Sequence, residues 1–255
     1  MPLTLTPLTG IPLVQPGDNL GQQITNAIQK SQIELQDGDI LVITQKVVSK
    51  SENRFVNLNG ILASPEAVII AGKTEKDPRF VELVLRESKS ILRMRSGTLI
   101  AEHKLGFVCA NAGIDHSNVQ SLGGNSDDWV LLLPENPDES ARRIREELEK
   151  ESGKKIGVLI IDSHGRAWRM GAVGVAIGLS GIPALVDMRG KPDLFGYQLR
   201  VTLVAAADEL AAAASLLMGQ ADEFTPVIHV RGFPYPLRES TVQELIRPKD
   251  LDLFR

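Results

Sequence analysis

GFVCANAGIDHSN, residues 106–118, is the stretch that decides how this chain is organised. Its first five residues, 106–110, are mostly apolar and predict a buried strand. The strand breaks at a turn that contains a glycine, and Asp115, Ser117 and Asn118 follow. Short oxygen-bearing side chains on a turn after a buried strand are typical of sites that bind metals or phosphates.

A second stretch has the same arrangement. Residues 156–161 are apolar and predict another buried strand, which ends in Asp162 and Ser163. Two strands that each end in an aspartate predict that Asp115 and Asp162 converge on one hard cation such as Mg²⁺ or Mn²⁺. Aspartate is also a common turn former after a strand, so the spacing alone leaves both interpretations open.

The composition is that of an ordinary soluble globular protein, with 43% hydrophobic and 24% charged residues. The 255 residues suffice for one large domain or two small ones. A net charge of -4 argues against a nucleic-acid surface driven by bulk charge, and 4% aromatic residues argue against stacking platforms for single strands. We therefore expect no nucleic-acid partner.

Cys109 is the single cysteine, which excludes an internal disulfide and a cysteine-based zinc site. It lies in an apolar run, so we expect it to act as a small buried hydrophobe. No apolar run approaches the roughly 18 residues of a membrane span, and residues 1–10 lack the pattern of a signal peptide. These features predict a cytoplasmic protein with no membrane partner.

Hydrophobic periodicity predicts a mixture of helices and strands. Helices are expected over residues 20–28, from Asp77-Pro78 to Ile91, over 138–151 and over 205–218. Strands are expected over residues 40–44, 106–110, 129–133, 156–161, 200–204 and 226–230. Because these elements do not alternate cleanly as βαβ units, we expect an α+β fold, with the best break in the chain at residues 190–193.

Two further patterns concern phosphate binding. Residues 72–74, GKT, look like the end of a P-loop, but that motif needs a glycine where this chain has Ala67, so no P-loop is expected. Lys46, Lys50 and Arg54 recur every four residues, and on a helix they would share one face that could clamp phosphates or a carboxylate. A solvated basic face is the competing interpretation.

The polar loop at residues 218–225 follows the alanine-rich helix and precedes a strand. Loops in such positions often contact ligands, although a plain connector would have the same composition.

These stretches together resemble a known family. GFVCANAGID at residues 106–115, with Ser117 and Asn118, resembles one signature of the coenzyme F420-0:γ-glutamyl ligase family, and DSHGRAWR followed by GAVGVAIG, residues 162–178, resembles another. Shorter matches to the family occur in order along the chain, at residues 11–13, 44–50, 76–79 and 218–222. His164 stands where relatives are expected to have phenylalanine, and Phe224 where a small or polar residue is usual; neither is expected to touch a proposed ligand.

The resemblance implies a GTP-dependent amide ligase that joins the amine of L-glutamate to the terminal carboxylate of a deazaflavin precursor, coenzyme F420-0, and then adds γ-linked glutamates. It also implies one ligase domain over residues 1–255 with an α+β fold, two subdomains (1–95 with 192–255, and 96–191) and an intertwined homodimer. Mn²⁺ or Mg²⁺ with K⁺ would serve as cofactors. FMN is not expected, because the flavin-binding domain of some relatives has no counterpart here.

The family's functional residues carry over position by position. The metal ligands would be Asp115, Asp162 and Ser163, with Gln220 as a weaker candidate, and Lys50 would act in catalysis with the two aspartates. The nucleotide would contact Gly10, Ile11, Pro12, Leu13, Thr44, Gln45, Lys50, Asn118, Met218, Gly219, Gln220, Ala221, Asp222, Glu223, Phe224 and Thr225. The residue patterns independently favour the two aspartates and Lys50, but gave no reason to choose the N-terminal segment.

The chemistry implied by the resemblance is activation of a carboxylate, which is a poor acyl donor, by the γ-phosphoryl group of GTP. An acyl phosphate would form, and glutamate would attack it. A related ligase with a folate-like acceptor is an alternative. A nucleotide-binding or structural domain without turnover is another, although a degenerate relative would be expected to have lost Asp115 or Asp162.

Overall fold

The structure, a computed structural model, describes residues 2–253. Its central sheet has the strand order β1-β12-β2-β8-β9. The strands are β1 (Thr4–Pro7), β12 (Val227–Arg231), β2 (Ile40–Thr44), β8 (Gly157–Arg166) and β9 (Arg169–Ser180). Only the β2–β8 pair is parallel; the other neighbours in this sheet are antiparallel. This mixed sheet and the helices around it confirm the expected α+β class.

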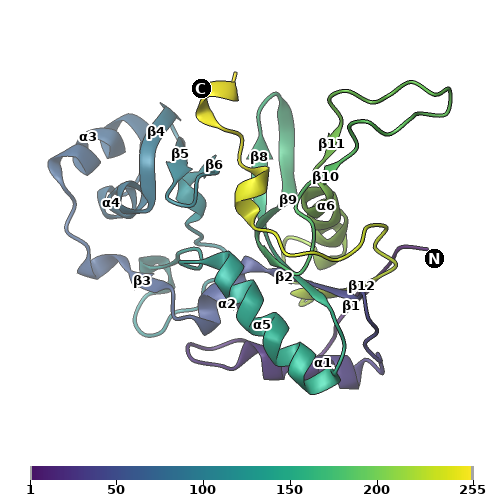
Figure 1. The fold of residues 1–255 in the computed structure, drawn as a ribbon. Helices are drawn as coiled ribbons and strands as arrows, with labels where there is room; N and C mark the ends of the chain where they lie inside the picture. The colour runs from purple at the N-terminus through teal and green to yellow at the C-terminus, as the bar shows by residue number, and fades with distance from the viewer. Residues whose placement is uncertain (1, 254–255) are drawn as a thin grey trace.

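Helices cover both faces of the central sheet (Figure 1). On one face, α1 (Leu20–Lys30) and α5 (Pro137–Ser152) pack against Leu41 and Ile43 of β2. On the other face, α6 (Ala206–Met218) packs against Ile40 and Val42. Because successive strand side chains point to opposite faces, a strand buried on both faces must be apolar throughout, which accounts for the uninterrupted ILVI run of β2.

A second lobe lies beside the central sheet, on the left of Figure 1. It contains α3 (Pro65–Thr74), α4 (Pro78–Glu87) and the sheet of β4 (Ser88–Arg95), β5 (Thr98–His103) and β6 (Val108–Ala110). The pair β3 (Phe55–Asn57) and β7 (Trp129–Leu131) adjoins it, and the short helix α2 (Gln45–Ser51) follows β2. The lobe has its own hydrophobic core, which includes Phe80, Val84 and Leu99.

An arm projects from the far side of the sheet and is formed by residues 186–204 (Figure 1). Its base is the antiparallel pair β10 (Val186–Asp187) and β11 (Leu203–Val204). The break expected at residues 190–193 lies in this arm. The proposed division into two subdomains stays a prediction; the central sheet takes strands from both of the proposed parts.

Three of the predicted helix ends are confirmed, and each has a capping residue. The Asn19 side chain accepts a hydrogen bond from the Gln22 N–H at 2.9 Å and begins α1, and Asp77 caps α4 in the same way. Gly153 ends α5 with φ 69°, a left-handed conformation that favours glycine. Residues 72–74 lie inside α3, so they form no phosphate-binding loop.

Several boundaries differ from expectation. The helix after Asp77 ends at Glu87, and Ile91 lies in β4 because the chain turns into a hairpin. The strand predicted over 106–110 begins at Val108 and is an edge strand, so only Cys109 of its three residues is buried. The strand predicted over 200–204 shrinks to the two residues of β11. Strands β1, β3, β4, β5, β9 and β10 and helices α2 and α3 were not predicted.

The described residues contain no helix with the length and apolarity needed to cross a lipid bilayer.

Candidate functional site

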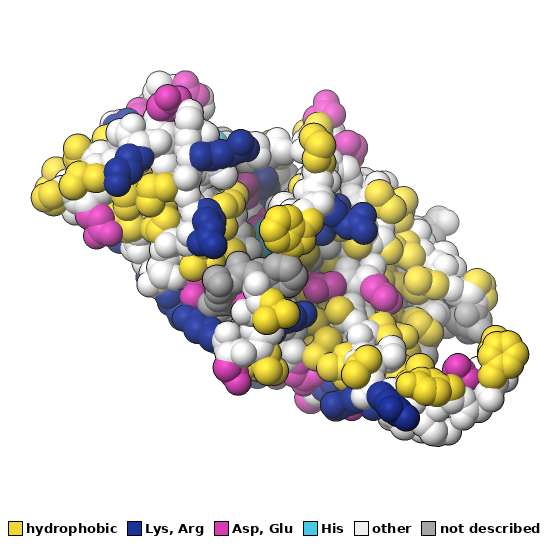
Figure 2. Space-filling model, turned by 90° about the horizontal axis from the view of Figure 1, so that it is seen from above, with side chains coloured by type: hydrophobic (Ala, Val, Ile, Leu, Met, Phe, Trp, Pro, Cys, Tyr) yellow, Lys and Arg dark blue, Asp and Glu magenta, His cyan; other side chains and the backbone are white. Residues whose placement is uncertain are grey.

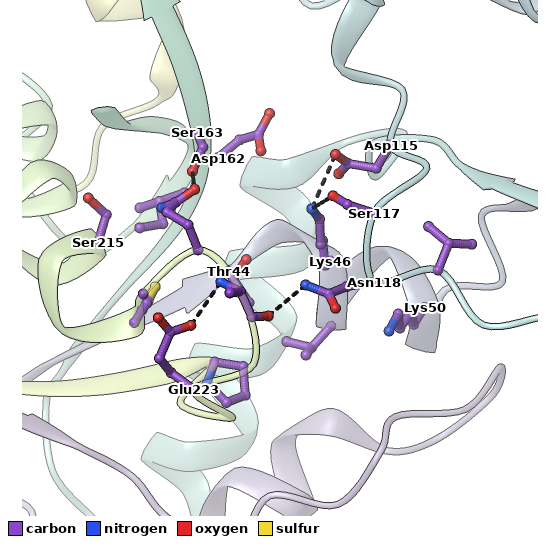
Figure 3. Close-up of a pocket in the computed structure, with 18 of the residues that line it drawn as sticks. Thr44, Lys46, Lys50, Asp115, Ser117, Asn118, Asp162, Ser163, Ser215 and Glu223 are labelled. Carbon is purple, nitrogen blue, oxygen red and sulfur yellow. Dashed lines mark hydrogen bonds and ion pairs between the residues drawn. The ribbon is translucent and has the colours of Figure 1, made fainter. Parts of the chain in front are cut away.

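A cavity of about 680 Å³, the main cavity, lies where the central sheet meets the second lobe. Its walls come from the segment after β1, the start of α2, the turn after β6, the middle of β8 and the loop after α6. Figure 3 shows that Asp115 and Asp162 enter it from opposite walls, with Lys46 between them. The segments that carried the sequence signals therefore meet at one place.

The parallel pairing of β2 and β8 explains part of this convergence. Thr44 is in register with Ile161, so the residues that follow each of them lie close together where the pairing of β2 with β8 ends. On one strand this brings in Gln45 and Lys46 at the start of α2, and on the other Asp162. Ligand sites form at the carboxyl ends of parallel strands for this topological reason.

The turn after β6 directs Asp115 into the cavity. Asn111, Ala112 and Gly113 all have positive φ, at 53°, 52° and 68°. Two of them are not glycine, and each such residue costs on the order of 1–3 kcal/mol of local strain, which clusters at functional sites. The Asp115 backbone then forms a two-way bridge with Leu131, at 3.0 and 2.9 Å, which fixes the direction of its side chain.

Asp115 sits in an unusual electrostatic environment. Burial raises the pKa of its carboxyl, the negative charge of Asp162 raises it further, and Lys46 opposes both, which leaves the pKa at about 6. Lys46 Nζ lies 3.2 Å from Asp115 Oδ1, and the Gln45 amide donates a hydrogen bond to Oδ2. The protein's own positive charge near Asp115 is therefore too small to offset burial and the charge of Asp162.

The sequence suggested that Asp162 lies at the end of its strand, but the structure places it elsewhere. β8 continues to Arg166 and turns into β9, so Asp162 projects from the middle of a long hairpin. Its Oδ2 lies 3.0 Å from His164 Nε2. The expectation that His164 touches no proposed ligand is thus wrong: two residues apart on a strand, both side chains project from the same face.

Ser163 and Gln220 also line the main cavity. The Ser163 hydroxyl donates a hydrogen bond to Gln220 Oε1 at 2.9 Å, which joins β8 to the loop after α6 (Figure 3). The same loop is tied to the turn after β6, because the Asn118 amide donates to the Ala221 carbonyl at 2.9 Å. Residues 218–225 therefore form part of the cavity wall and are more than a connector.

The three cations expected on one helix face separate in the structure. Lys46 and Lys50 lie on α2 and line the main cavity. Burial lowers the pKa of Lys50, and the neighbouring charge of Lys46 lowers it further. Arg54 lies beyond the end of α2, where its guanidinium binds the Leu133 carbonyl and Glu135, so it does not join them.

Most residues expected at the nucleotide line the main cavity. They are Ile11, Pro12, Leu13, Thr44, Lys50, Asn118 and residues 218–225. Gly10 is not among the lining residues, and Gln45 is 1% exposed beneath the site, where it binds Asp115. His164 was not among the predicted site residues. Its position two residues after Asp162 would have suggested a shared face only if the strand had been extended past Asp162.

The donor set fits a hard divalent cation. Two carboxylates, the Ser163 hydroxyl and the Gln220 amide offer oxygen atoms, and the raised pKa of Asp115 reflects a carboxyl that a cation would stabilise. Within residues 2–253, no group of three or more His, Cys, Asp or Glu side chains converges as a complete metal site. This suits Mg²⁺ or Mn²⁺, which keep several waters and bind substrate phosphates beside one or two carboxylates.

The fold and the site define an α+β enzyme whose cavity combines oxygen-bearing side chains with lysine side chains. Residues 10–232 match the family described as F420-0:Gamma-glutamyl ligase, and the chain belongs to this family. The resemblance seen in the signature stretches is confirmed, and so is the expectation of a ligase-class enzyme.

Similar proteins cover the chain almost completely. A protein named coenzyme F420:L-glutamate ligase from Methanothermobacter thermautotrophicus is 45% identical over 257 residues, 100% of both chains. Proteins of the same name are 47% identical over 92% of both chains in Methanocaldococcus jannaschii, and 39% identical over 100% of this chain and 97% of the relative in Archaeoglobus fulgidus.

Proposed function

We propose that this protein joins L-glutamate to the terminal carboxylate of coenzyme F420-0 in a GTP-dependent reaction, and then adds further γ-linked glutamates. The observation that carries the proposal is the entry of Asp115 and Asp162 into one cavity with Lys46 and Lys50, in a chain of this ligase family. The names of the similar proteins support the acceptor and the amino acid.

The reaction would pass through an acyl phosphate. The acceptor carboxylate attacks the γ-phosphorus of GTP, the bond to the β-phosphate oxygen breaks, and GDP leaves. The amine of glutamate then attacks the acyl carbon, the bond from that carbon to the phosphate oxygen breaks, and inorganic phosphate leaves with the proton that the amine gives up. Phosphoryl transfer depends mostly on positioning and charge stabilisation, which are what the residues of the main cavity offer.

Asp115, Asp162, Ser163 and Gln220 would hold Mg²⁺ or Mn²⁺, which when bound neutralises phosphate charge. Lys50, partly desolvated beside the cavity, would add a fixed positive charge near the transferred group. The nucleotide would lie along residues 11–13, Thr44, Asn118 and the loop 218–225. K⁺ would accompany the divalent ion, and we expect no requirement for FMN.

We also propose that the protein acts as a homodimer. The tip of the arm exposes large apolar side chains, with Leu194 98% and Phe195 95% exposed, and Val201 lies farther along it at 85%. Figure 2 shows hydrophobic side chains along this projection. Large apolar side chains exposed together on one projection are typical of an interaction site, and a second copy of the chain would cover them.

The test is to incubate the purified protein with GTP, Mn²⁺, L-glutamate and coenzyme F420-0 and to follow the mass of the product. A glutamate-sized increase that disappears when GTP is omitted supports the proposal. No increase with coenzyme F420-0, but an increase with a folate-like acceptor, would favour the alternative ligase. If the protein is folded and neither acceptor gains mass, the result would contradict ligase activity.

A further inference from the structure

A second cavity of about 430 Å³ adjoins the main cavity. It lies on the side of the second lobe, between the start of α4 and the turn after β6, and Asp127 forms part of its rim. Asn111, Ile114 and Ser117 line both cavities, so the two meet at the segment that carries Asp115. None of the roles proposed above uses this space.

The second cavity has an aromatic base. Phe80 is 5% exposed, and the His116 ring stacks on it with 5.1 Å between centroids and 28° between planes. Lys76 Nζ lies over the Phe80 ring at 5.7 Å from its centroid. This contact holds the lysine side chain at the cavity while its ammonium group keeps its capacity for hydrogen bonds.

Two charged groups in this cavity have no ion-pair partner among the described residues. Asp77 lines it, but its carboxylate is committed to Arg79, with 2.6 Å between Oδ2 and Nη2, and to the cap of α4. The Lys76 ammonium and the Asp127 carboxylate make no hydrogen bond or ion pair with any residue between 2 and 253. The cavity therefore offers one cation and one anion, which is the complement of a zwitterion.

The junction between the cavities contains an unsatisfied amide. Asn111 Oδ1 is buried and has no hydrogen-bond partner among the described residues, and its backbone is held at φ 53°. A buried polar atom without a partner costs about 1–3 kcal/mol, so it needs an explanation. A ligand N–H at the junction would supply one, because a turn of the carboxamide would let it accept that hydrogen bond.

We infer that the second cavity binds the free amino acid substrate, a conclusion that rests on the proposed ligase function. A carboxylate of the amino acid pairs with Lys76, Asp127 balances the charge of its amine, and the amine lies toward Asn111 beside the main cavity. The volume is at the small end of the range for ligand cavities, about 300–1,000 Å³, and fits an amino acid better than a deazaflavin coenzyme.

The test compares Lys76→Met and Asp127→Asn with wild type. Lys73→Met is the matched control, because Lys73 lies on the neighbouring α3, is exposed and lines neither cavity. We expect the KM for L-glutamate to rise about tenfold or more in Lys76→Met, the effect of losing one charge-assisted hydrogen bond. The KM values for GTP and for the coenzyme should stay within about twofold of wild type, as should every KM of the control.

Direct binding separates this inference from the proposed function. Calorimetric titration of L-glutamate into wild type and Lys76→Met needs no turnover, and thermal melting checks that each variant folds. Glutamate binding lost in Lys76→Met would support the site even if wild type ligated no glutamate. A rise in the KM for the coenzyme instead would mean that the cavity holds the deazaflavin, and unchanged glutamate binding and KM in both variants would equally overturn the inference.

Discussion

Lys46 and Asp115 form an ion pair inside the main cavity, with 3.2 Å between Nζ and Oδ1. The pair joins α2 to the turn after β6, and Lys46 Nζ also lies 3.2 Å from the Ser117 hydroxyl. Each partner is less than one quarter exposed, so solvent screens the interaction only in part. Lys46 is therefore the counter-charge of Asp115 in the protein alone, and it would be close to any phosphate bound between the two aspartates.

The first prediction concerns Lys46. We expect Lys46→Met to lower kcat/KM by about 10²–10³-fold, the range found when one preorganised donor is removed from a reacting oxyanion. Lys46→Arg keeps the charge and should lose less. Steady-state kinetics of glutamate ligation checks both variants, and a methionine variant with wild-type turnover would remove Lys46 from the catalytic site.

The second prediction is that Asp115→Asn lowers activity but raises the stability of the metal-free protein. The pKa of Asp115 is about 6 in the folded protein, above its ordinary value of 3.8. A carboxyl with a raised pKa stabilises the fold below its unfolded pKa, and that contribution is lost as the pH rises through 6. At about pH 7.5 the variant should gain on the order of 1–2 kcal/mol in free energy of unfolding, after allowance for solvent screening.

Urea denaturation with a chelator present measures this difference. At about pH 3, where the carboxyl is mostly protonated in both states, most of the advantage of the variant should disappear. Turnover should fall by at least about 100-fold, as for other groups that hold charge at a reacting centre. An asparagine variant that is less stable than wild type at both pH values would contradict the electrostatic account of Asp115.

The third prediction concerns His103, the last residue of β5 in the second lobe, whose ring stacks on Phe107 with 5.2 Å between centroids. Burial lowers the pKa of His103 to about 4, although the nearby Glu87 opposes this shift. Its Nδ1 accepts a hydrogen bond from the Leu105 N–H at 3.0 Å, which requires the neutral ring. Because the unfolded histidine binds a proton near pH 6.5, stability should fall as the pH drops from 6.5 toward 4, by up to about 3 kcal/mol.

The comparison is with His103→Phe, which keeps a ring on Phe107 and removes the titration. Its free energy of unfolding should depend less on pH between 6.5 and 4 than that of wild type. If the free energy of unfolding depends equally on pH in the two proteins, protonation of His103 is not coupled to unfolding.

The sequence predicted the parts of the fold that rest on local chemistry. The ILVIT run of β2 and the capped helices α1 and α5 combine strong periodicity with clear end signals, and their boundaries were predicted to within about two residues. The second lobe was largely missed, because β4 is mostly solvent-facing and has no apolar alternation to detect.

Within the site, the sequence suggested both aspartates but not their partners. Asp115 and Asp162 each follow an apolar run, and such a signal can be detected within a single short segment of the chain. The contacts of Gln45 with Asp115 and of His164 with Asp162 depend on how α2 and the β8–β9 hairpin pack, which no local pattern contains. Gly106 and its neighbours were expected in a buried strand, yet β6 is an edge strand whose partner, β5, was itself not predicted.

The last prediction tests why glycine recurs along β9. A Cβ atom at Gly178 would collide with the backbone of Pro137, at the start of α5, and backbone cannot move as a flexible side chain can. Gly178→Ala should therefore cost at least about 1–3 kcal/mol, as overpacking of a well-packed core does, and separate the helix from the sheet. Gly165→Ala on the same hairpin is the control, because no atom lies within 4 Å of its Cβ position. Denaturant unfolding of both variants should show a large loss only for Gly178→Ala. Equal losses would mean that backbone freedom in the hairpin, rather than close packing of α5 on β9, accounts for these glycines.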